Sequence, residues 1–400
     1  MTRTLIYSHD TYGLGHLRRC TLLAGGLVDA DPDNDVVIVT GSPRAQAFPL
    51  PERVDTIKLP AATKDDGGGY QARKLRCDLA SLVRLRSDLL LAAVASYEPD
   101  VVLVDHAPIG MAGELLPLLT RLASSRRGPR LVLGLRDIID DAAKVARCWE
   151  IDGSRDALAG YDEVLVYGDP QILTTAQELG LERRLDVPVH HTGYVAPSMP
   201  DAFGGEPFVL VTPGGGGDGQ ELLRRHLDAV EAGALGGMRS VVVTGPLMSV
   251  GRRAEVLARA DAVEGVTLLE FAEDMRSLIA SATAVVSMAG YNTVVEELAA
   301  ARPALLVPRS APRLEQDIRA RRLEPVSGVE RCPVEELSSA RIGSFVERAA
   351  ARDAHPTTVD LGGVQRAATL IAPSASPSAE AHSGGRQPRP TEPERNPCHA

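Results

Sequence analysis

The feature that most constrains the fold is the stretch 283–308, TAVVSMAGYNTVVEELAAARPALLVP. It predicts a buried strand at 284–286, a tight turn at 287–290, a helix over 291–300 and a second buried strand at 304–307. Two short apolar runs joined by one helix are typical of a βαβ unit in a parallel sheet.

The turn of this unit has the chemistry of a nucleotide site. Small residues from Ser287 to Gly290 allow a ligand to approach the backbone, and the start of the following helix presents N–H groups to an anion such as phosphate. Glu296 lies roughly 8 Å along the helix axis, where its carboxylate could accept hydrogen bonds from ribose hydroxyls. We therefore interpret the stretch as half of a nucleotide site.

Strands and helices are also predicted to alternate along the rest of the chain, and this alternation falls into two halves. A length of 400 residues favours two domains, and each predicted half opens with a strand, a glycine loop and a helix. This predicts an α/β fold of two Rossmann-like, doubly wound domains facing across a cleft. The expected parts are an acceptor domain over 1–200, a nucleotide-sugar domain over 208–345, a helical segment over 346–372 and a disordered tail over 373–400.

Composition excludes several partners. A net charge of −10 argues against a nucleic-acid partner. No run approaches the roughly 18 apolar residues of a membrane span, and the N-terminus lacks the apolar core of a signal peptide, so we expect a cytoplasmic protein. Basic residues in the first third, among them Arg73, Lys74, Arg76 and Arg84, leave peripheral contact with the inner face of a membrane open, although a solvated helix face explains them as well.

Polar side chains gather where predicted strands end, which is where parallel sheets bind ligands. In the first half these are His9, Asp10, His16, Asp105, His106, Arg136 and Asp137. Two glycine loops accompany them. One contains Gly13 and Gly15 in the sequence GLGH, and the other is TPGGGGDG at 212–219, where consecutive glycines indicate close approach of a ligand.

These motifs together resemble family 28 glycosyltransferases, which have the two-domain GT-B fold. SMAGYNTVVEEL, then RPALLVP and Glu315-Gln316, resemble that family's C-terminal half, and the two glycine loops resemble those that open its domains. The resemblance covers roughly 4–30 and 208–320. Met288 and the loops of the first half depart from the family's murein-pathway member, which implies a different acceptor.

The resemblance implies a role for each matching position in binding the donor. Gly214, Gly215, Gly216 and Gly217 would lie by the diphosphate or the reacting sugar, and Leu269 to Phe271 would flank the uracil. The turn residues Ser287, Ala289 and Gly290, with Asn292 and Thr293, would surround the phosphates. Glu296 would bind the ribose, Glu315 and Gln316 would touch the donor sugar, and His16 would face the reaction centre.

Glycosyl transfer also needs a base for the acceptor hydroxyl. His16 is the first candidate and Asp105 the second, because both follow strands and can titrate or accept a proton. The alternatives are that His16 only binds or caps the loop and that Asp105 caps a helix; His9, Asp10, His106 and Asp137 remain further candidates. Retaining enzymes of this fold often carry two glutamates eight residues apart, and here Met288 lies eight before Glu296, which favours inversion.

The prediction is therefore an inverting transferase that moves a sugar, of the N-acetylhexosamine type, from a UDP-sugar to an unknown acceptor. We expect no cofactor and no metal, because no Asp-x-Asp pair follows a strand in the second half and the five cysteines share no metal-type spacing. A UDP-sugar hydrolase or 2-epimerase on the same fold is the alternative, and a non-catalytic nucleotide-sugar binder is a third possibility.

Overall fold

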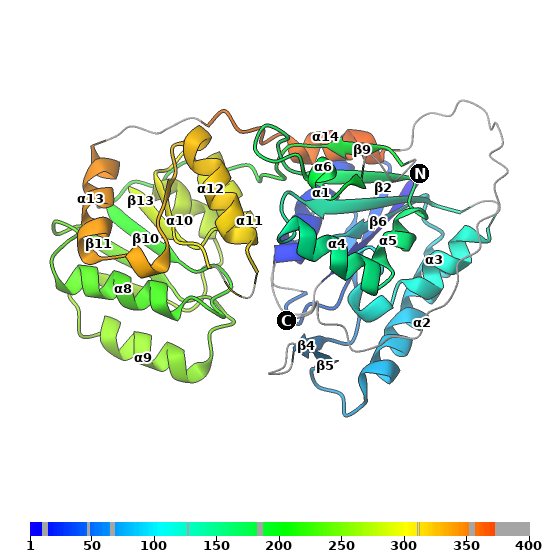
Figure 1. Cartoon of the computed structure of the whole chain (residues 1–400), viewed down its shortest axis with the longest axis horizontal. Coiled ribbons are helices and arrows are strands. Elements are labelled where there is room, and N and C mark those ends of the chain that lie inside the picture. The colour runs from blue at the N-terminus through cyan, green and yellow to red at the C-terminus, as the bar shows by residue number, and fades with distance from the viewer. Residues whose placement is uncertain are drawn as a thin grey trace. The chain divides into compact units, whose positions relative to one another are not determined.

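The computed structural model describes residues 1–9, 15–45, 49–64, 69–125, 128–181, 187–309, 311, 313–351 and 357–372. It divides the chain into two compact units (Figure 1). The N-terminal unit comprises Met1–Pro170, Thr174–Val195 and the chain from Gly362, and the C-terminal unit comprises Gln171–Leu173 and Ala196–Leu361.

The N-terminal unit is built on a seven-stranded sheet in the order β3-β2-β1-β6-β7-β8-β9, and all of its strand pairs are parallel. Its central strands at Val101–Asp105 and Glu163–Tyr167 are buried along their whole length, as a sheet covered by helices requires, whereas the edge strands are partly exposed. The elements are β1 (Thr2–Ser8), α1 (Gly15–Ala30), β2 (Asn34–Thr40), β3 (Val54–Lys58), β4 (Ala62–Lys64), β5 (Tyr70–Ala72), α2 (Leu79–Tyr97), β6 (Val101–Asp105), η1 (Met111–Gly113), α3 (Leu116–Ala123), β7 (Arg130–Arg136), α4 (Ala142–Ile151), α5 (Ser154–Leu158), β8 (Glu163–Tyr167), α6 (Thr175–Glu178), β9 (Val189–His191) and α14 (Gly363–Ile371).

The C-terminal unit has a six-stranded parallel sheet in the order β12-β11-β10-β13-β14-β15, the strand order of a dinucleotide-binding fold. The elements are β10 (Phe208–Thr212), α8 (Gln220–Glu231), β11 (Arg239–Val243), α9 (Val250–Ala260), β12 (Val266–Leu269), α10 (Met275–Ser281), β13 (Ala284–Ser287), α11 (Tyr291–Ala299), β14 (Ala304–Leu306), α12 (Glu315–Ser327), β15 (Glu330–Arg331), η2 (Val334–Glu336) and α13 (Ser339–Ala350). The predicted fold class, two doubly wound α/β halves, is confirmed, and the central βαβ unit is β13-α11-β14.

The stretch 346–372 does not form one segment. The end of α13 belongs to the C-terminal unit, whereas α14 packs on α1 of the N-terminal unit (Figure 1). The contact is close, because a Cβ at Gly26 would lie 2.4 Å from Val364 Cγ1. The predicted tail, 373–400, lies outside the described residues.

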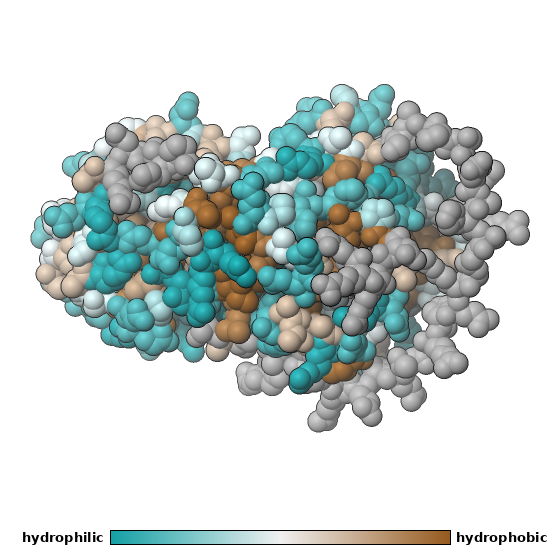
Figure 2. All heavy atoms as spheres, turned by 45° about the horizontal axis from the view of Figure 1, so that its top comes forward, coloured by the Kyte–Doolittle hydropathy of each residue, from teal (hydrophilic) through white to brown (hydrophobic). Residues whose placement is uncertain are grey.

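The surface agrees with a chain in which 24% of residues are charged. On the face that Figure 2 shows, hydrophilic residues cover most of the described surface, and hydrophobic residues appear in patches between them. No helix in the described ranges is long and apolar enough to cross a membrane.

Candidate active site

The two leading base candidates of the N-terminal unit form a hydrogen-bonded pair. His16 lies in the first turn of α1 and Asp105 ends β6, and His16 Nδ1 is 2.6 Å from Asp105 Oδ2. The strands β1 and β6 are neighbours and parallel, so the carboxyl ends of both strands lie at the same sheet edge.

Arg19, one helical turn after His16, binds both oxygens of Asp105 and also lies against His16, with its Nη2 3.0 Å from His16 Nδ1. Its Nε and Nη2 donate to Asp105 Oδ1 at 2.9 and 2.8 Å, and Nη2 also lies 2.8 Å from Oδ2. Both side chains are buried, with 2% of Arg19 and none of Asp105 exposed. Sequence reasoning gave Arg19 no specific role; its i+3 spacing from His16 was the available signal.

These contacts determine the tautomer of His16. Burial raises the pKa of Asp105, but the Arg19 cation and the hydrogen bond from His16 outweigh it and lower that pKa to about 2, so the carboxylate accepts and cannot donate. The short bond therefore needs a proton on His16 Nδ1, which leaves the lone pair on Nε2. Burial lowers the pKa of His16 against the opposing influence of Asp105, which favours the neutral imidazole. With 19% of its side chain exposed, His16 can be reached by a substrate.

Two more histidines lie beside this pair. The ring of His106 is 5.1 Å from that of His16 and 6.0 Å from that of His9, measured between centroids. His106 has a φ of +73°, which a non-glycine residue rarely adopts and which is often found at functional sites. Burial and the neighbouring Arg136 cation hold its pKa well below the usual range.

The remaining candidates of this half differ in their surroundings. Asp137 is buried and bound by the Tyr194 hydroxyl at 3.1 Å and the Ile138 amide at 2.7 Å, which explains it as a structural carboxylate. Gly15 begins α1. Asp10 and Gly13 lie outside the described residues.

A second buried ionic group, which the sequence did not indicate, lies in the same unit. Glu114 binds Arg86 through Oε1 at 2.7 Å and also through Oε2, and Oε1 accepts from the Tyr7 hydroxyl at 2.6 Å. Tyr7 Oη in turn accepts from the Met111 amide at 3.0 Å. This network fixes the segment after β6, which contains η1 and leads into α3.

In the C-terminal unit, the turn after β13 is bound by a side chain of α12, and the helix that follows the turn, α11, begins without a side-chain cap. Arg319, which is fully buried in α12, donates from Nη1 to the Ala289 carbonyl at 2.7 Å and lies over the Tyr291 ring. Gly290 is the N-cap of α11 and has no side-chain cap. A Cβ built on Gly290 would meet no atom of the described residues within 4 Å, so these residues leave space for a ligand at this helix start.

Glu296 and Glu297 are both buried on α11, with 1% and 0% exposed. The pKa of Glu297 is raised to about 8, because burial, together with the neighbouring Glu296 carboxylate, outweighs the opposing hydrogen bond with Ser287. Neither Asn292 nor Thr293 is buried, so both are accessible at the helix start. A ribose contact by Glu296 remains a prediction.

The glycine loop after β10 lies next to this turn. The Gly214 amide donates to Thr212 Oγ1 at 3.1 Å, and a Cβ at Gly214 would lie 3.5 Å from Thr293 Oγ1. Gly216 has a φ of +90°, and a Cβ there would be 2.1 Å from the Thr244 carbonyl oxygen. Only glycine fits this position, because the loop passes directly against the backbone that follows β11.

The predicted sugar contacts Glu315 and Gln316 begin α12, and Arg309 binds both. Arg309 Nη2 lies 2.6 Å from Glu315 Oε1, and the Arg309 amide donates to Gln316 Oε1 at 3.1 Å. At the predicted uracil position, the Leu269 carbonyl already accepts from the Thr244 amide at 2.9 Å, whereas the Phe271 side chain is 39% exposed. The structure thus gathers the predicted donor residues of this unit along the carboxyl edge of its sheet.

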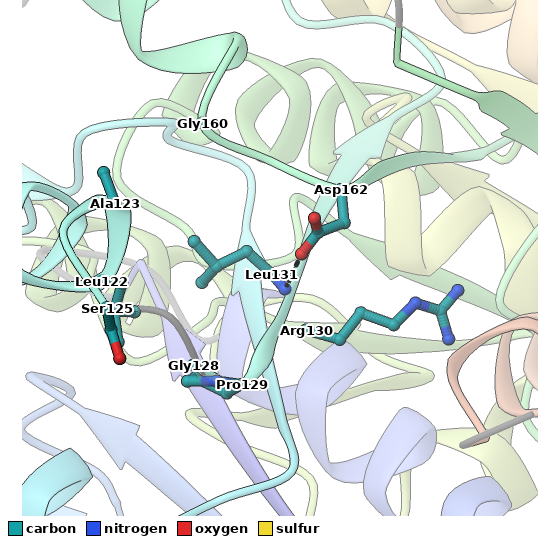
Figure 3. Close-up of a pocket in the computed structure, with 9 residues that line it drawn as sticks. All are labelled: Leu122, Ala123, Ser125, Gly128, Pro129, Arg130, Leu131, Gly160 and Asp162. Carbon is teal, nitrogen blue, oxygen red and sulfur yellow. Dashed lines mark hydrogen bonds between the residues drawn. The ribbon is translucent and has the colours of Figure 1, made fainter. Parts of the chain in front are cut away.

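A pocket of about 540 Å³ lies elsewhere, at the amino end of β7 (Figure 3). There Asp162 Oδ2 accepts from the Leu131 amide at 2.7 Å, and Arg130 pairs with Glu163. Ligands of parallel sheets bind at the carboxyl ends of strands, so this pocket is not the candidate site.

Comparison with known proteins agrees with this geometry. Residues 215–359 match the model of the glycosyltransferase family 28 C-terminal domain. No curated protein matches the sequence. Among solved structures, MurG of Acinetobacter baumannii is 13% identical, with 93% of this chain and 99% of that chain covered and a TM-score of 0.55.

Two further structures show the breadth of the fold. Medicago truncatula UGT71G1, solved with UDP-glucose, is 12% identical, with 92% of this chain and 94% of that chain covered and a TM-score of 0.60. A putative UDP-N-acetylglucosamine 2-epimerase from Listeria monocytogenes is 14% identical, with the same coverages and a TM-score of 0.60.

The fold and the matched domain define the class: the chain is a glycosyltransferase of the GT-B fold. Within that class, residues 215–359 belong to the family 28 C-terminal domain, as the central motif suggested. The three solved structures, each below 25% identity, show the fold alone.

Proposed function

We propose that the chain is an inverting, metal-independent glycosyltransferase that moves a sugar of the N-acetylhexosamine type from a UDP-sugar to an acceptor hydroxyl. The observation that carries the proposal is the pair of His16 and Asp105, because an inverting transfer needs a neutral base with a fixed tautomer. The family 28 C-terminal domain supports a nucleotide-sugar donor.

In the proposed step, His16 Nε2 takes the proton of the acceptor hydroxyl while the oxygen attacks the anomeric carbon. The bond from that carbon to the diphosphate oxygen breaks, and UDP leaves with the electron pair. Asp105 accepts the Nδ1–H and stabilises the imidazolium that forms, in the manner of a carboxylate that orients a catalytic histidine.

The C-terminal unit would stabilise the leaving diphosphate. The open start of α11 offers backbone N–H groups and the positive end of a helix dipole, and Gly214 and Gly216 allow close approach of the phosphates. Glu296 would bind the ribose, and Glu315 and Gln316 the donor sugar. We propose that these groups suffice without a metal ion or a cofactor.

The test is a donor-turnover assay. Purified protein is incubated with UDP-, dTDP- and GDP-sugars, first alone and then with a cell extract as the source of acceptor, and release of nucleotide is followed. Release of UDP that requires the extract is expected. Rapid release of UDP without extract would instead indicate a hydrolase or a 2-epimerase, a function that the histidine cluster around His106 could also serve.

We further propose a cytoplasmic protein that contacts the inner face of a membrane through its N-terminal unit. Leu75, Leu85 and Leu89 are 48%, 42% and 38% exposed at and before α2. Exposed basic residues lie beside them in the sequence, which suits an anionic lipid surface: Arg73, Lys74, Arg76 and Arg84. Co-sedimentation with phosphatidylglycerol vesicles, but not with phosphatidylcholine vesicles, is expected, and binding to neither would refute this location.

A further inference from the structure

Arg309 makes three contacts that link separate parts of the C-terminal unit. Its Nη1 lies 2.6 Å from Asp218 Oδ2 on the glycine loop, and its Nη2 lies 2.6 Å from Glu315 Oε1 at the start of α12. Its backbone amide donates to Gln316 Oε1 at 3.1 Å. The side chain is 28% exposed, so the guanidinium is accessible from the site and yet largely enclosed.

The place of Arg309 follows from the sheet. β14 pairs with β13 in parallel register, Leu306 opposite Ser287, and the Val307 amide donates to the Ser287 carbonyl at 2.7 Å. The chain beyond β14 therefore runs beside the turn at 287–290 that follows β13, where the donor phosphates are expected. Position 288 in that turn is a buried methionine, so Arg309 brings a cation to this sheet edge from the neighbouring strand.

The contacts also decide how the sugar-binding groups are presented. Because the Arg309 amide occupies Gln316 Oε1, the Gln316 amide is oriented with its NH₂ group as the remaining donor. The guanidinium pairs with two carboxylates, Asp218 and Glu315, and so fixes where each of them lies. Arg309 thus fixes the positions of both predicted sugar contacts relative to the glycine loop.

We propose that Arg309 is the positioning residue for the donor sugar, tying the glycine loop to Glu315 and Gln316 so that the site recognises the sugar as well as the nucleotide. The inference rests on the proposed function, which assigns those two side chains to the sugar. Arg309 acts through them, and no contact of its own with the substrate is needed.

The link itself is tested without ligand by hydrogen exchange of the full chain. Arg309→Met is expected to raise amide exchange over 214–219 and at the start of α12, since the tie between them is lost. The matched control is Arg321→Met. Arg321 lies on α12, its side chain is 65% exposed, and it pairs with Asp317 at 2.7 Å. Unchanged exchange in the Arg309 variant would overturn the inference.

The consequence for recognition is tested by calorimetry with UDP and a panel of UDP-hexoses and UDP-N-acetylhexosamines. In the wild type the best-bound UDP-sugar should bind tighter than UDP. Arg309→Met should reduce that advantage roughly tenfold while affinity for UDP stays within about twofold. Arg309→Lys should restore part of it, because a point charge can pair with one carboxylate but cannot form the fork.

Two comparisons separate positioning from a general structural effect. Adding Arg309→Met to Glu315→Gln should have little further effect on sugar affinity, because the first residue acts through the second. Equal losses of UDP and UDP-sugar affinity, or additive losses in the double variant, would overturn the inference. Failure of the wild type to bind UDP or any UDP-sugar would overturn the proposed function itself, while the exchange experiment still decides whether the tie exists.

Discussion

Asp105→Asn is the most informative change in the N-terminal unit. The side chain keeps its size but loses its charge, so Arg19 remains buried without its counter-ion. Arg19 can only donate and takes the one remaining oxygen, so the new NH₂ group faces His16 Nδ1 and favours the tautomer with its proton on Nε2. The change therefore affects stability through Arg19 and activity through His16, and the two effects can be measured apart.

The structure gives the size of each effect. Removing one partner of a buried, hydrogen-bonded ion pair costs about 3–5 kcal/mol, and here the bidentate contacts and near-complete burial of both side chains apply. Loss of an oriented general base lowers the rate by roughly 10²–10⁴-fold. For Asp105→Asn we expect a lower free energy of unfolding and, at a temperature at which the variant is still folded, this loss in turnover.

Two companion variants separate these effects. His16→Gln removes the base but leaves Asp105 paired with Arg19, so it should lose similar activity with only about 1 kcal/mol of stability. The double variant Arg19→Met/Asp105→Leu replaces the buried pair by apolar groups and should recover most of the stability but none of the activity.

Denaturant unfolding and extract-dependent UDP release, measured on the same preparations, provide the readouts. If Asp105→Asn is destabilised as expected but keeps turnover within about threefold of the wild type, Asp105 does not orient the base. If His16→Gln is equally active, the base lies elsewhere, and His106 and His9 become the next residues to substitute.

Three further predictions concern pH and the glycine loop. Because burial lowers the pKa of His16, the acid limb of the extract-dependent rate should follow one proton with a midpoint below about 6.5, and a midpoint above that value would contradict a neutral buried base. The pKa of Glu297 is raised to about 8 in the folded state, so the stability that its neutral form contributes is fully present below about pH 4.5 and is lost as the pH rises through 8. The loss is at most about 5 kcal/mol. Glu297→Gln should make the free energy of unfolding less dependent on pH, as measured by urea unfolding at pH 5 and 8.5. Gly216→Ala should abolish UDP binding, since its Cβ would lie 2.1 Å from the Thr244 carbonyl oxygen, whereas Gly251→Ala, with open space and a helical position, should bind UDP normally and melt at the same temperature or higher.

Local patterns predicted the framework of the fold. The apolar runs around 291–299 and the glycine-rich turns identified the βαβ unit, and strand ends predicted where polar residues gather. His16 and Asp105 were both named because each follows a strand, and the parallel pairing of β1 and β6 brings such positions to one edge. Their direct contact could not be predicted, since it depends on rotamers and on loop paths.

The sequence did not indicate contacts between residues that lie far apart along the chain. Arg86 and Glu114 meet through tertiary packing, and Arg309 reaches Asp218, 91 residues away. The return of α14 to the N-terminal unit was also missed, because its helical pattern shows an apolar face without showing which surface covers it. The hairpin of β4 and β5 also has no signal in the sequence, since three-residue strands carry too short a pattern to detect.

The two units each bury a carboxylate, and the comparison shows why Arg19 matters. Asp105 and Glu297 are both fully buried, and burial alone raises the pKa of either. Asp105 pairs with a buried guanidinium and with an imidazole, and its pKa falls to about 2. Glu297 faces Ser287 and a second glutamate, and its pKa rises to about 8. At neutral pH the first is charged and can hold the Nδ1–H of His16, whereas the second is mostly protonated. A buried acid in this fold can therefore orient a base only where the chain also supplies a cation, and Arg19, one turn beyond His16, supplies it.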